Sequence, residues 1–331
     1  MYKPEVTFVV LCYNLGRFVG ECIDSILGQE GPQDFEIVVV DDASSDDSAA
    51  VLRRYTDPRV RIVTHSKNQG HIGAVEHALR AARGRYVARI DGDDRYKPGY
   101  LAAVLPAIRQ RPNVGLVYGN VDLIDAAGQV TGHALDNLHG DSDAEGNELV
   151  RLLERNFICA PTVIARREAW LNALPVPSGL AFHDWYFTLM IAREWDFFHR
   201  GAMLADYRVH AGQLHTQVVR DRTEEPSIFR MLDMVFAGAD RTTALGRAMI
   251  RQRRRIYGAN YLTLARKYFG FGMTGDARRC YLRALAHRPA YITDWSVSRQ
   301  CFGAIVGQRA YTRMKAWAQA VMPARSSRAA A

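Results

Sequence analysis

The first 90 residues alternate short apolar runs with segments in which apolar positions recur at helical spacing. The apolar runs, none of which shows the polar alternation of a half-exposed strand, are residues 6–11, 36–40, 60–65 and 86–90. The helical segments are residues 18–27, 49–55 and 74–82. Fully apolar strands that are separated by helices predict a largely parallel sheet with both faces covered.

Polar residues follow three of these four predicted strands at the point where each strand ends. They are Tyr13 and Asn14 after the first strand, Asp41 and Asp42 after the second, and Asp91, Gly92, Asp93 and Asp94 after the fourth. Right-handed crossovers bring the carboxyl ends of parallel strands to one edge of the sheet, and ligands bind in the crevice outside that edge. We therefore expect an α/β, Rossmann-like fold with its site at this edge.

The aspartates allow more than one interpretation. Asp41 and Asp42 precede a serine-rich turn, where turn formation and helix capping explain them as well as binding does. The carboxylates within residues 91–94 are too dense for capping alone, because like charges repel. Neither a glycine-rich dinucleotide fingerprint nor a Walker phosphate loop is present. Since carboxylate oxygens suit Mg²⁺ and Mn²⁺, the cluster predicts a divalent cation in place of a glycine cradle for phosphates.

Four segments stand out together along the chain. They are TFVVLCYNLGRFVGECIDSILGQ, FEIVVVDDASSDDS, NQGHIGAVEHALRAARGRYVARIDGDDRYKPGYL and HDWYF. In this order they resemble the inverting family-2 glycosyltransferases with the GT-A fold, over roughly residues 5–210. The resemblance implies a catalytic domain over 1–215 that moves a sugar from a nucleotide-diphosphate donor, a UDP-sugar favoured, to a hydroxyl of a glycan or lipid-linked glycan.

The resemblance also implies roles for individual positions. The nucleotide-binding residues would be Tyr13, Asn14, Asp41, Asp42, Asp91 and Gly92. Among them Tyr13 and Asp42 would line the pocket for the base, and Asp91 would lie near the ribose. Asp93, the last residue of the D-x-D pattern, would bind the Mg²⁺ or Mn²⁺ that bridges the diphosphate. His210, in a Tyr-Arg-x-His segment like those that close many such domains, would either complete the metal shell or contact the diphosphate.

Inverting sugar transfer requires a general base that takes the proton from the acceptor hydroxyl. Family members place an acidic residue, often in a Glu-Asp pair, where this chain has His183-Asp184 at the start of an apolar helical stretch. Asp184 would then be the base of a metal-assisted single displacement. The alternative is a carboxylate that the helix dipole favours at an N-terminus. Three other histidines, which have no partner visible from the spacing, are expected to be ordinary surface or core residues: His65, His71 and His139.

Charge divides the chain into two halves. Residues 216–331 contain 21 Lys and Arg against 7 Asp and Glu, whereas residues 1–215 contain 22 against 28. The basic half is patterned as helices, and residues 258–291 match the 34-residue tetratricopeptide pattern at Tyr261, Leu264, Tyr268, Ala277, Tyr281, Ala284 and Pro289. One repeat cannot bury its own face. It would therefore pack on the catalytic domain or form a homo-oligomer through the C-terminal helices.

The last predicted helix, residues 300–322, has an apolar stripe with cations along its edges. The stripe consists of Phe302, Val306, Ala310, Met314, Trp317 and Val321, and the cations are Arg309, Arg313 and Lys315. Such a helix suits an anionic membrane surface, but it also suits docking on a core with its basic face in solvent. With the basic block 251–255, the first interpretation would place the enzyme at the inner membrane leaflet, where a lipid-linked acceptor would be presented.

Composition sets the broad class of protein. The chain is 48% hydrophobic and 24% charged, as in ordinary globular proteins, and no run approaches the ~18 apolar residues of a spanning helix. Five scattered cysteines without a C-x-x-C pair argue against a disulfide framework and a zinc site. This cysteine pattern fits a reducing cytoplasm. The resemblance implies an enzyme of bacterial surface polysaccharide or glycolipid synthesis, which would be peripheral at the inner membrane face if its last helix binds lipid.

Two other classes of function fit fewer residues. A sugar-nucleotide nucleotidyltransferase should carry a glycine-rich basic loop after its first strand, but LCYNLGRF has one Gly and one Arg. A protein that binds nucleic acid or a membrane through the basic half would leave the aspartates unexplained, and salt-dependent binding would identify a nucleic-acid partner. We expect no nucleic acid. The sugar, the base of the donor, the acceptor and the oligomeric state stay open.

Overall fold

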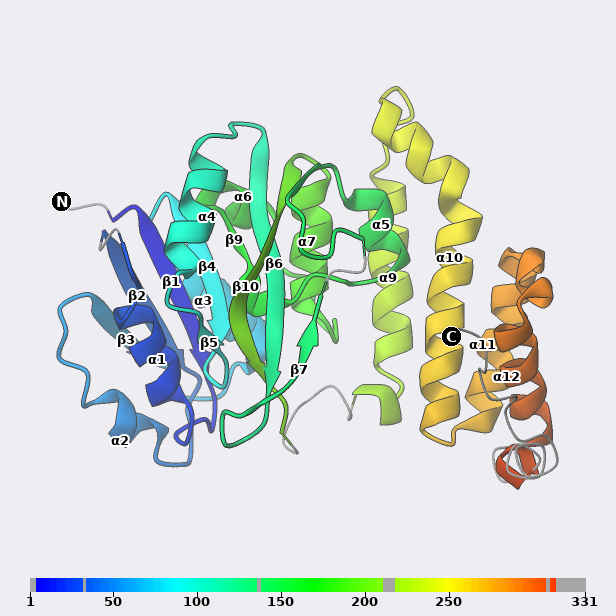
Figure 1. Ribbon diagram of the computed structural model, residues 1–331, viewed down its shortest axis with the longest axis horizontal. Helices are drawn as coiled ribbons and strands as arrows, with labels where there is room; N and C mark the ends of the chain where they lie inside the picture. Colours follow the sequence, from blue (N-terminus) through cyan, green and yellow to red (C-terminus); the bar gives the residue numbers. More distant parts are fainter. Residues whose placement is uncertain (1–3, 32–33, 136–137, 211–217, 308–309, 314–331) are drawn as a thin grey trace, which may run out of the picture. The chain divides into compact units, whose positions relative to one another are not determined.

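The computed structural model describes residues 4–31, 34–135, 138–210, 218–307 and 310–313 (Figure 1). The chain divides into two compact units, Met1–Leu214 and His215–Ala331. In Figure 1 the first unit runs from blue to green and the second from yellow to red. The first contains the sheet, and the second contains helices.

The first unit is built on one ten-stranded mixed sheet. The strands are β1 Val6–Cys12, β2 Phe35–Asp41, β3 Val60–Thr64, β4 Tyr86–Asp91, β5 Arg95–Tyr96, β6 Val114–Ile124, β7 Val130–Ala134, β8 Ala144–Gly146, β9 Ile164–Arg166 and β10 Asp196–Arg208. Their order is β3-β2-β1-β4-β9-β6-β10-β5, with β7 beside β6 and β8 beside β10. The four strands expected from the sequence pair in parallel around β1. This confirms the α/β fold class, while β9 runs antiparallel between β4 and β6.

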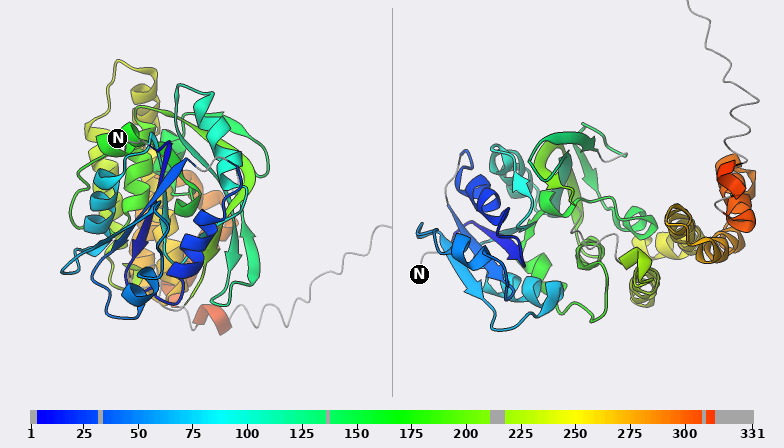
Figure 2. Two further views of the ribbon diagram at one scale, coloured as in Figure 1. Left: turned by 90° about the vertical axis from the view of Figure 1, so that its left-hand side faces the viewer. Right: turned by 90° about the horizontal axis from the view of Figure 1, so that it is seen from below.

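Helices cover both faces of this sheet (Figure 2). They are α1 Val19–Leu27, α2 Ser48–Leu52, α3 Gly70–Ala81, α4 Tyr100–Arg109, α5 Leu149–Glu154, α6 Arg167–Asn172 and α7 His183–Ala192, with a 3₁₀ turn η1 at Ala160–Thr162. Phe8 and Val10 of β1 pack in one core cluster with residues of α1 and α4. Val9, between them, is equally buried on the opposite face, where α3 contacts β1 and β2.

The helical segment predicted after the first strand is present as α1. The apolar positions of α1 that predicted one helical face, Val19, Cys22, Ile23 and Ile26, are its buried residues. β6 and β7 form an antiparallel hairpin, and Gly128 in its turn adopts a φ of 81°, which suits glycine. β6 runs over 11 residues from Val114 to Ile124 and is a long central strand.

The second unit is helical, as expected. Its helices are α9 Glu224–Ala237, α10 Ala244–Gly270, α11 Thr274–His287 and α12 Trp295–Val306, with a 3₁₀ turn η2 at Pro289–Thr293. α10 and α11 pack together. Five of the seven positions that match the tetratricopeptide pattern are buried: Leu264, Tyr268, Ala277, Tyr281 and Ala284.

The C-terminal helix differs from the predicted range 300–322. α12 begins at Trp295 and ends at Val306, because Gly307 has a φ of 89° and so leaves the helical conformation. Met314, Trp317 and Val321 of the predicted stripe lie outside the described residues. Within the part of the chain that the structure describes, no helix combines the length and the apolar character needed to cross a bilayer.

Candidate active site

The register of the sheet brings the predicted site residues to one edge. Cys12 of β1 pairs with Asp41 of β2, and Leu11 pairs with Asp91 of β4. The residues that follow these strands therefore leave the sheet side by side. The expectation that the two aspartate groups would converge on one crevice agrees with this geometry.

The loop after β1 is locked to the loop after β2. The Asn14 backbone N–H donates to Ser44 Oγ over 3.0 Å, and Asn14 Oδ1 accepts from the backbone N–H of Ser45 over 2.8 Å. Asn14 and Ala43 have φ values of 56° and 61°, which is the sparsely populated left-handed region for residues with a Cβ. The Asn14 side chain and backbone thus fix the loop after β1 against the loop after β2. Tyr13, the neighbour of Asn14, is 50% exposed.

The two adjacent aspartates after β2 have different partners. Asp41 Oδ1 accepts the backbone N–H of Ser44 over 3.1 Å, the hydrogen bond of a turn. Asp42 Oδ1 accepts from His65 Nδ1 over 2.7 Å and from the backbone N–H of Gln69 over 2.8 Å. Turn chemistry therefore explains Asp41, whereas Asp42 belongs to a side-chain network.

The three histidines for which residue spacing revealed no partner, His65, His71 and His139, each have one in the structure. His65 contacts Asp42 as above and, through Nε2, His77 Nδ1 at 2.8 Å. His71 Nε2 lies 3.0 Å from Asp91 Oδ1. Their partners come from other elements of the fold, namely the loop after β2, helix α3 and strand β4, so residue spacing did not reveal them. His139 also has a partner, Glu148, at 3.1 Å.

Asp91 is held by a buried cation that the sequence analysis missed. Arg89, two residues earlier on β4, is 3% exposed, and its Nη2 lies 2.5 Å from Asp91 Oδ1. Burial alone would raise the pKa of Asp91, but the charges of Arg89 and His71 outweigh it and hold that pKa well below its usual value. The signal in the sequence was a lone arginine inside an apolar strand, since a buried charge requires a partner.

Asp93 and His210 lie together at the end of β4 and β10. Asp93 Oδ2 and His210 Nε2 are 3.1 Å apart. Burial and the negative charge of Asp91 raise the pKa of Asp93, so a cation here would relieve an uncompensated charge. Among the described residues no group of three or more His, Cys, Asp or Glu side chains gathers as a metal site. A carboxylate and an imidazole fit Mg²⁺ or Mn²⁺ only with further oxygen ligands from a bound molecule.

Arg208 fixes the position of this pair, and the sequence analysis gave it no role. Its side chain is fully buried at 0% exposure. Arg208 Nε donates to the backbone oxygen of Asp93 over 2.7 Å, and Nη2 donates to Glu21 Oε2 over 2.7 Å. The Arg208 backbone N–H donates to Asp94 Oδ1 over 2.8 Å. One guanidinium therefore joins α1, the 91–94 turn and the end of β10, which leads to His210.

Asp184 lies in the first turn of α7. Its Oδ2 accepts from Asn156 Nδ2 over 3.2 Å, so a residue that the sequence analysis did not identify orients the carboxylate. Trp185 is 4% exposed, and its Nε1 donates to the backbone oxygen of Leu152 over 2.9 Å. It is therefore a core residue that anchors this end of the helix.

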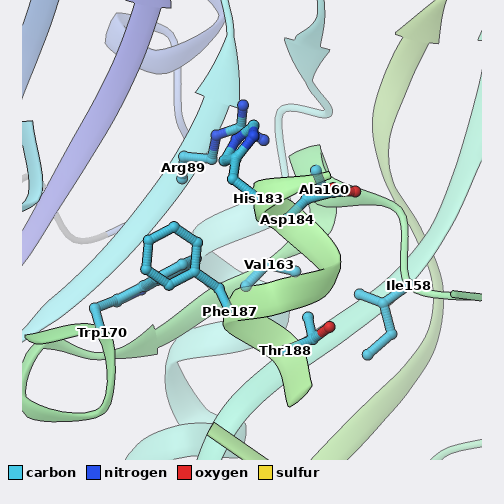
Figure 3. A pocket seen from close by; sticks show the side chains of 9 residues that line it. All are labelled: Arg89, Ile158, Ala160, Val163, Trp170, His183, Asp184, Phe187 and Thr188. Carbon is cyan, nitrogen blue, oxygen red and sulfur yellow. The ribbon is translucent and has the colours of Figure 1, made fainter. Parts of the chain in front are cut away.

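A small pocket lies beside Asp184 (Figure 3). It is lined by Arg89, Ile158, Ala160, Val163, Trp170, His183, Asp184, Phe187 and Thr188. The His183 ring centroid lies 4.2 Å from that of His71. Burial, with the nearby charges of His71 and Arg89, lowers the pKa of His183 well below its usual value. The pocket thus connects the network around Asp91 to Asp184.

Comparisons with known proteins place this site in a family. The glycosyl transferase family 2 model matches residues 7–173. The succinoglycan biosynthesis protein ExoO of Rhizobium meliloti is 36% identical over 126 residues, which are 38% of this chain and 36% of that protein. The chain therefore spans only about a third of the length of this curated relative.

Solved structures support the fold. S. aureus TarS in complex with UDP-GlcNAc superimposes with a TM-score of 0.59 at 15% identity, over 91% of this chain and 79% of that one. The mannosyltransferase PcManGT of Pyrobaculum calidifontis, with GDP-Man and Mn²⁺, gives a TM-score of 0.56 at 21% identity, over 92% of this chain and 87% of that one. Since the family model covers half of the chain, the chain belongs to glycosyl transferase family 2, with a GT-A-like fold followed by a helical region.

Proposed function

We propose that this protein is an inverting glycosyltransferase that moves a sugar from a nucleotide-diphosphate donor to a hydroxyl acceptor. The observation that carries the proposal is the convergence of Asp42, Asp91 and Asp93 at the carboxyl ends of the parallel strands β1, β2 and β4. The Asp91 network leads on to Asp184 through the pocket beside α7. Such an edge is where ligands of open α/β sheets bind.

The nucleotide would bind over the ends of β1 and β2. Tyr13 is half exposed and can stack on a base, while Asp42 can accept an N–H from the base edge. A carboxylate accepts but does not donate, so a base that presents an N–H suits it, such as uracil with its N3–H. A UDP-sugar is the donor that we favour. Similar structures contain UDP-GlcNAc and GDP-Man, which agrees with a donor of this class. Asp91 and Gly92 would border the ribose.

Asp93 and His210 would hold a Mg²⁺ or Mn²⁺ ion. When bound, such an ion stabilises the negative charge that develops on the leaving diphosphate. The protein contributes a carboxylate and an imidazole only 3.1 Å apart, and Arg208 keeps both in place. The structure of PcManGT is of a complex with GDP-Man and Mn²⁺, which supports this choice of ion.

Asp184 would act as the general base. A base on the face of the sugar opposite to the leaving group takes the proton of the acceptor hydroxyl as that oxygen attacks the anomeric carbon, and the configuration inverts. The position of Asp184 at the N-terminus of α7 and its hydrogen bond from Asn156 keep the carboxylate oriented. Its second oxygen has no protein partner in the described residues and can receive the proton.

The relatives support a proposal for the acceptor and the pathway. ExoO takes part in succinoglycan biosynthesis, so a glycan or lipid-linked glycan acceptor in bacterial surface polysaccharide synthesis is the proposal for this chain. A cytoplasmic enzyme that works at the inner membrane face would meet such an acceptor.

The second unit would bring the enzyme to that membrane. Trp295, Phe302 and Val306 form one exposed apolar face of α12, and Arg299 lies on the same face. The opposite face, with Val297, is buried. Over residues 244–307 there are 12 Lys and Arg against 2 Asp and Glu. Apolar side chains within a cationic surface suit anionic lipid. We further propose that α10 and α11 form a single tetratricopeptide-like unit.

The first test is a thermal-shift panel of UDP-, GDP- and dTDP-sugars with Mn²⁺, Mg²⁺ or EDTA. A ligand that binds only the folded chain must raise the unfolding midpoint. We expect a rise for one nucleotide class that EDTA abolishes. Absence of a rise with any donor, with and without an acceptor glycolipid, would contradict the proposal.

A further inference from the structure

Tyr207 of β10 has a hydroxyl group without a partner in the protein. Among the described residues no group is hydrogen-bonded to it, whereas the hydroxyl of Tyr186 donates to the backbone oxygen of Ala173 over 3.0 Å. Tyr207 is half-buried, and its hydroxyl oxygen is not one of the unpartnered polar atoms that are closed off from solvent. A bound molecule can therefore reach it.

The alternation of side chains along β10 directs Tyr207 away from α1. Arg208, the residue after it, binds Glu21 of α1. Asp206, the residue before it, binds Arg95. Because successive side chains of a strand point to opposite faces of the sheet, the Tyr207 ring lies on the face opposite α1.

The proposed general base is on that same face. Ile90 of β4 packs in the cluster that contains residues of α1. Arg89, the residue before it, therefore points to the opposite face, where it borders the pocket beside α7. Asp184 borders the same pocket. Since β4 and β10 belong to one sheet, Tyr207 and Asp184 lie on the same side of it.

The acidic groups around Tyr207 show where its hydroxyl lies. Burial and the charge of Asp94 raise the pKa of Tyr207 well above its usual value, and Cys159, Asp91 and Asp93 add to the rise. Electrostatic interactions weaken with distance, so the hydroxyl is close to the turn that follows β4. It keeps its proton at neutral pH and is available as a hydrogen-bond donor.

Cys159 lies between this turn and the proposed base. Burial raises the pKa of its thiol well above the usual value, and the charges of Asp94 and Asp184 raise it further. The Tyr207 hydroxyl is close to both Asp94 and Cys159. It therefore faces the space between the carboxylates after β4 and Asp184. In the proposed reaction the transferred sugar occupies this space, because it lies between the leaving diphosphate and the general base.

The cross-strand neighbours of Tyr207 supply no polar side chain. Tyr207 is paired with Leu123 of β6, and Leu123 is paired with Gly132 of β7. The hydroxyl of Tyr207 is thus the polar side-chain group of this row of the sheet. We propose, resting on the function proposed above, that the Tyr207 hydroxyl donates a hydrogen bond to a hydroxyl of the transferred sugar and so helps to select the donor.

Isothermal titration of the full chain in the presence of Mn²⁺ tests this contact. The titrants are the nucleotide sugar that gives the largest rise in the thermal-shift panel and the matching nucleoside diphosphate. Tyr207→Phe removes one oxygen atom and keeps the ring. Loss of one hydrogen bond should raise the dissociation constant of the nucleotide sugar about fivefold and leave that of the diphosphate within about twofold.

The other outcomes of this titration overturn the inference. Unchanged binding of both ligands would mean that the hydroxyl touches neither. An equal loss for both would place the contact at the nucleoside diphosphate and not at the sugar. Either result leaves the proposed function standing, whereas failure of every nucleotide sugar and diphosphate to bind the wild type overturns both proposals.

Donors that lack one sugar hydroxyl identify the atom that Tyr207 contacts. Deoxy analogues of the same nucleotide sugar are titrated into the wild type and into Tyr207→Phe. Loss of the contacted hydroxyl should weaken binding to the wild type about fivefold, but binding to the variant less than about twofold, because both changes remove the same hydrogen bond. Equal factors in the two proteins for every analogue overturn the inference.

The unfolding midpoint without ligand separates this role from a structural one. Because its hydroxyl has no partner in the protein, Tyr207→Phe should unfold at the wild-type temperature. Tyr261→Phe is the matched control, since Tyr261 of α10 is also half-buried and its hydroxyl has no partner among the described residues. It should keep both wild-type dissociation constants. A lowered midpoint of Tyr207→Phe with an equal loss of both ligands would show a structural role and overturn the inference.

Discussion

His65 bridges Asp42 and His77 through its two ring nitrogens. Its Nδ1 lies 2.7 Å from Asp42 Oδ1, and its Nε2 lies 2.8 Å from His77 Nδ1. An ionised carboxylate only accepts, so the proton of this contact is on His65 Nδ1. In the neutral ring Nε2 then accepts from His77. The carboxylate proposed to read the nucleotide base is therefore oriented by a chain of two imidazoles.

Replacement of His65 should weaken nucleotide binding and leave the rate of the chemical step nearly unchanged. His65→Phe removes the strong hydrogen bond that orients Asp42, and we expect the dissociation constant of UDP to rise about tenfold. The value of kcat should change less than twofold. Titration of UDP and steady-state kinetics measure both. His133→Phe is the control, because His133 pairs with Asp122 but its side chain is 61% exposed. A purely structural role would instead lower kcat and the unfolding midpoint together.

Asp93→Asn should separate stability from activity. The raised pKa of Asp93 indicates an unfavourable charge in the metal-free protein, so the variant should unfold at the same or a higher temperature without metal. The stabilisation by UDP with Mn²⁺, about 2.7 kcal/mol at a hundredfold excess over the dissociation constant, should largely vanish, and transfer with it. EDTA on the wild type should reproduce the loss. An Asp93→Asn protein that is still stabilised by Mn²⁺ with UDP would exclude Asp93 as a ligand.

Asp184→Asn should retain the donor and lose transfer. The amide keeps the size of the side chain but cannot take a proton, so kcat should fall by about 10²–10⁴ while the affinity for UDP stays within twofold. Asn156→Ala removes the hydrogen bond to the Asp184 carboxylate but keeps the carboxylate itself. It should therefore lower kcat by a smaller factor than Asp184→Asn does. Turnover of Asp184→Asn at the wild-type rate would show that the carboxylate is merely a helix-terminal charge.

The ionised carboxylate of Glu36 should stabilise the first unit against unfolding at neutral pH, and this stabilisation should be lost in acid. Burial would raise the pKa of Glu36, but hydrogen bonds from Arg83 and Thr7 outweigh it and lower that pKa. The ionised Glu36 carboxylate therefore contributes its full share to the free energy of unfolding above about pH 4.3, the pKa of Glu in the unfolded chain. This contribution is lost as the pH falls through the lower pKa of Glu36 in the folded protein. Glu36→Gln should cost about 1–3 kcal/mol at pH 7.

The pH dependence of that difference distinguishes the ion pair from simple packing. The gap between wild type and Glu36→Gln, measured by calorimetry, should shrink as the pH falls from 7 to below about 4. Glu30→Gln, at an exposed position, should show no gap at either pH. A gap that is constant with pH would mean that the charge of Glu36 contributes nothing.

The apolar face of α12 should decide membrane association. Trp295 is 77% exposed and Phe302 48%, so Trp295→Ser with Phe302→Ser should abolish co-flotation with anionic vesicles. Val130→Ser, at a residue of β7 that is 52% exposed, is the control and should float like wild type. If the cations contribute to binding, none of the three proteins should float with neutral vesicles. Equal flotation of all proteins on neutral vesicles would contradict the electrostatic part of the proposal.

The sequence predicted those parts of the fold that local patterns encode. Apolar runs located β1 to β4, and helical spacing located α1. Strand ends then placed Asp42 and Asp93 at one edge, because parallel topology fixes where strands end. β9 and β10 were not predicted, since their role depends on pairing with distant strands.

The contacts of the site were harder to predict for the same reason. His71 lies twenty residues from Asp91 in the chain, and Asn156 twenty-eight from Asp184. Neither separation matches a helical or strand period. Arg89 is within two residues of its partner, but a strand of apolar neighbours gave no sign of which face it would occupy. The end of α12 depended on one backbone angle, that of Gly307.

Arg208 has a consequence for the order in which the enzyme becomes competent. Its hydrogen bonds reach back 83, 115 and 187 residues along the chain, to Asp125, Asp93 and Glu21. Contacts between residues so far apart in the chain form late. The entropy of closing the long loop is lost before these contacts can stabilise the folded chain. During synthesis the first four strands and their aspartates emerge well before β10. The nascent chain therefore presents the carboxylates of residues 91–94 before Arg208 and His210 are in place. It can assemble the proposed cation site only after β10 has docked on the sheet.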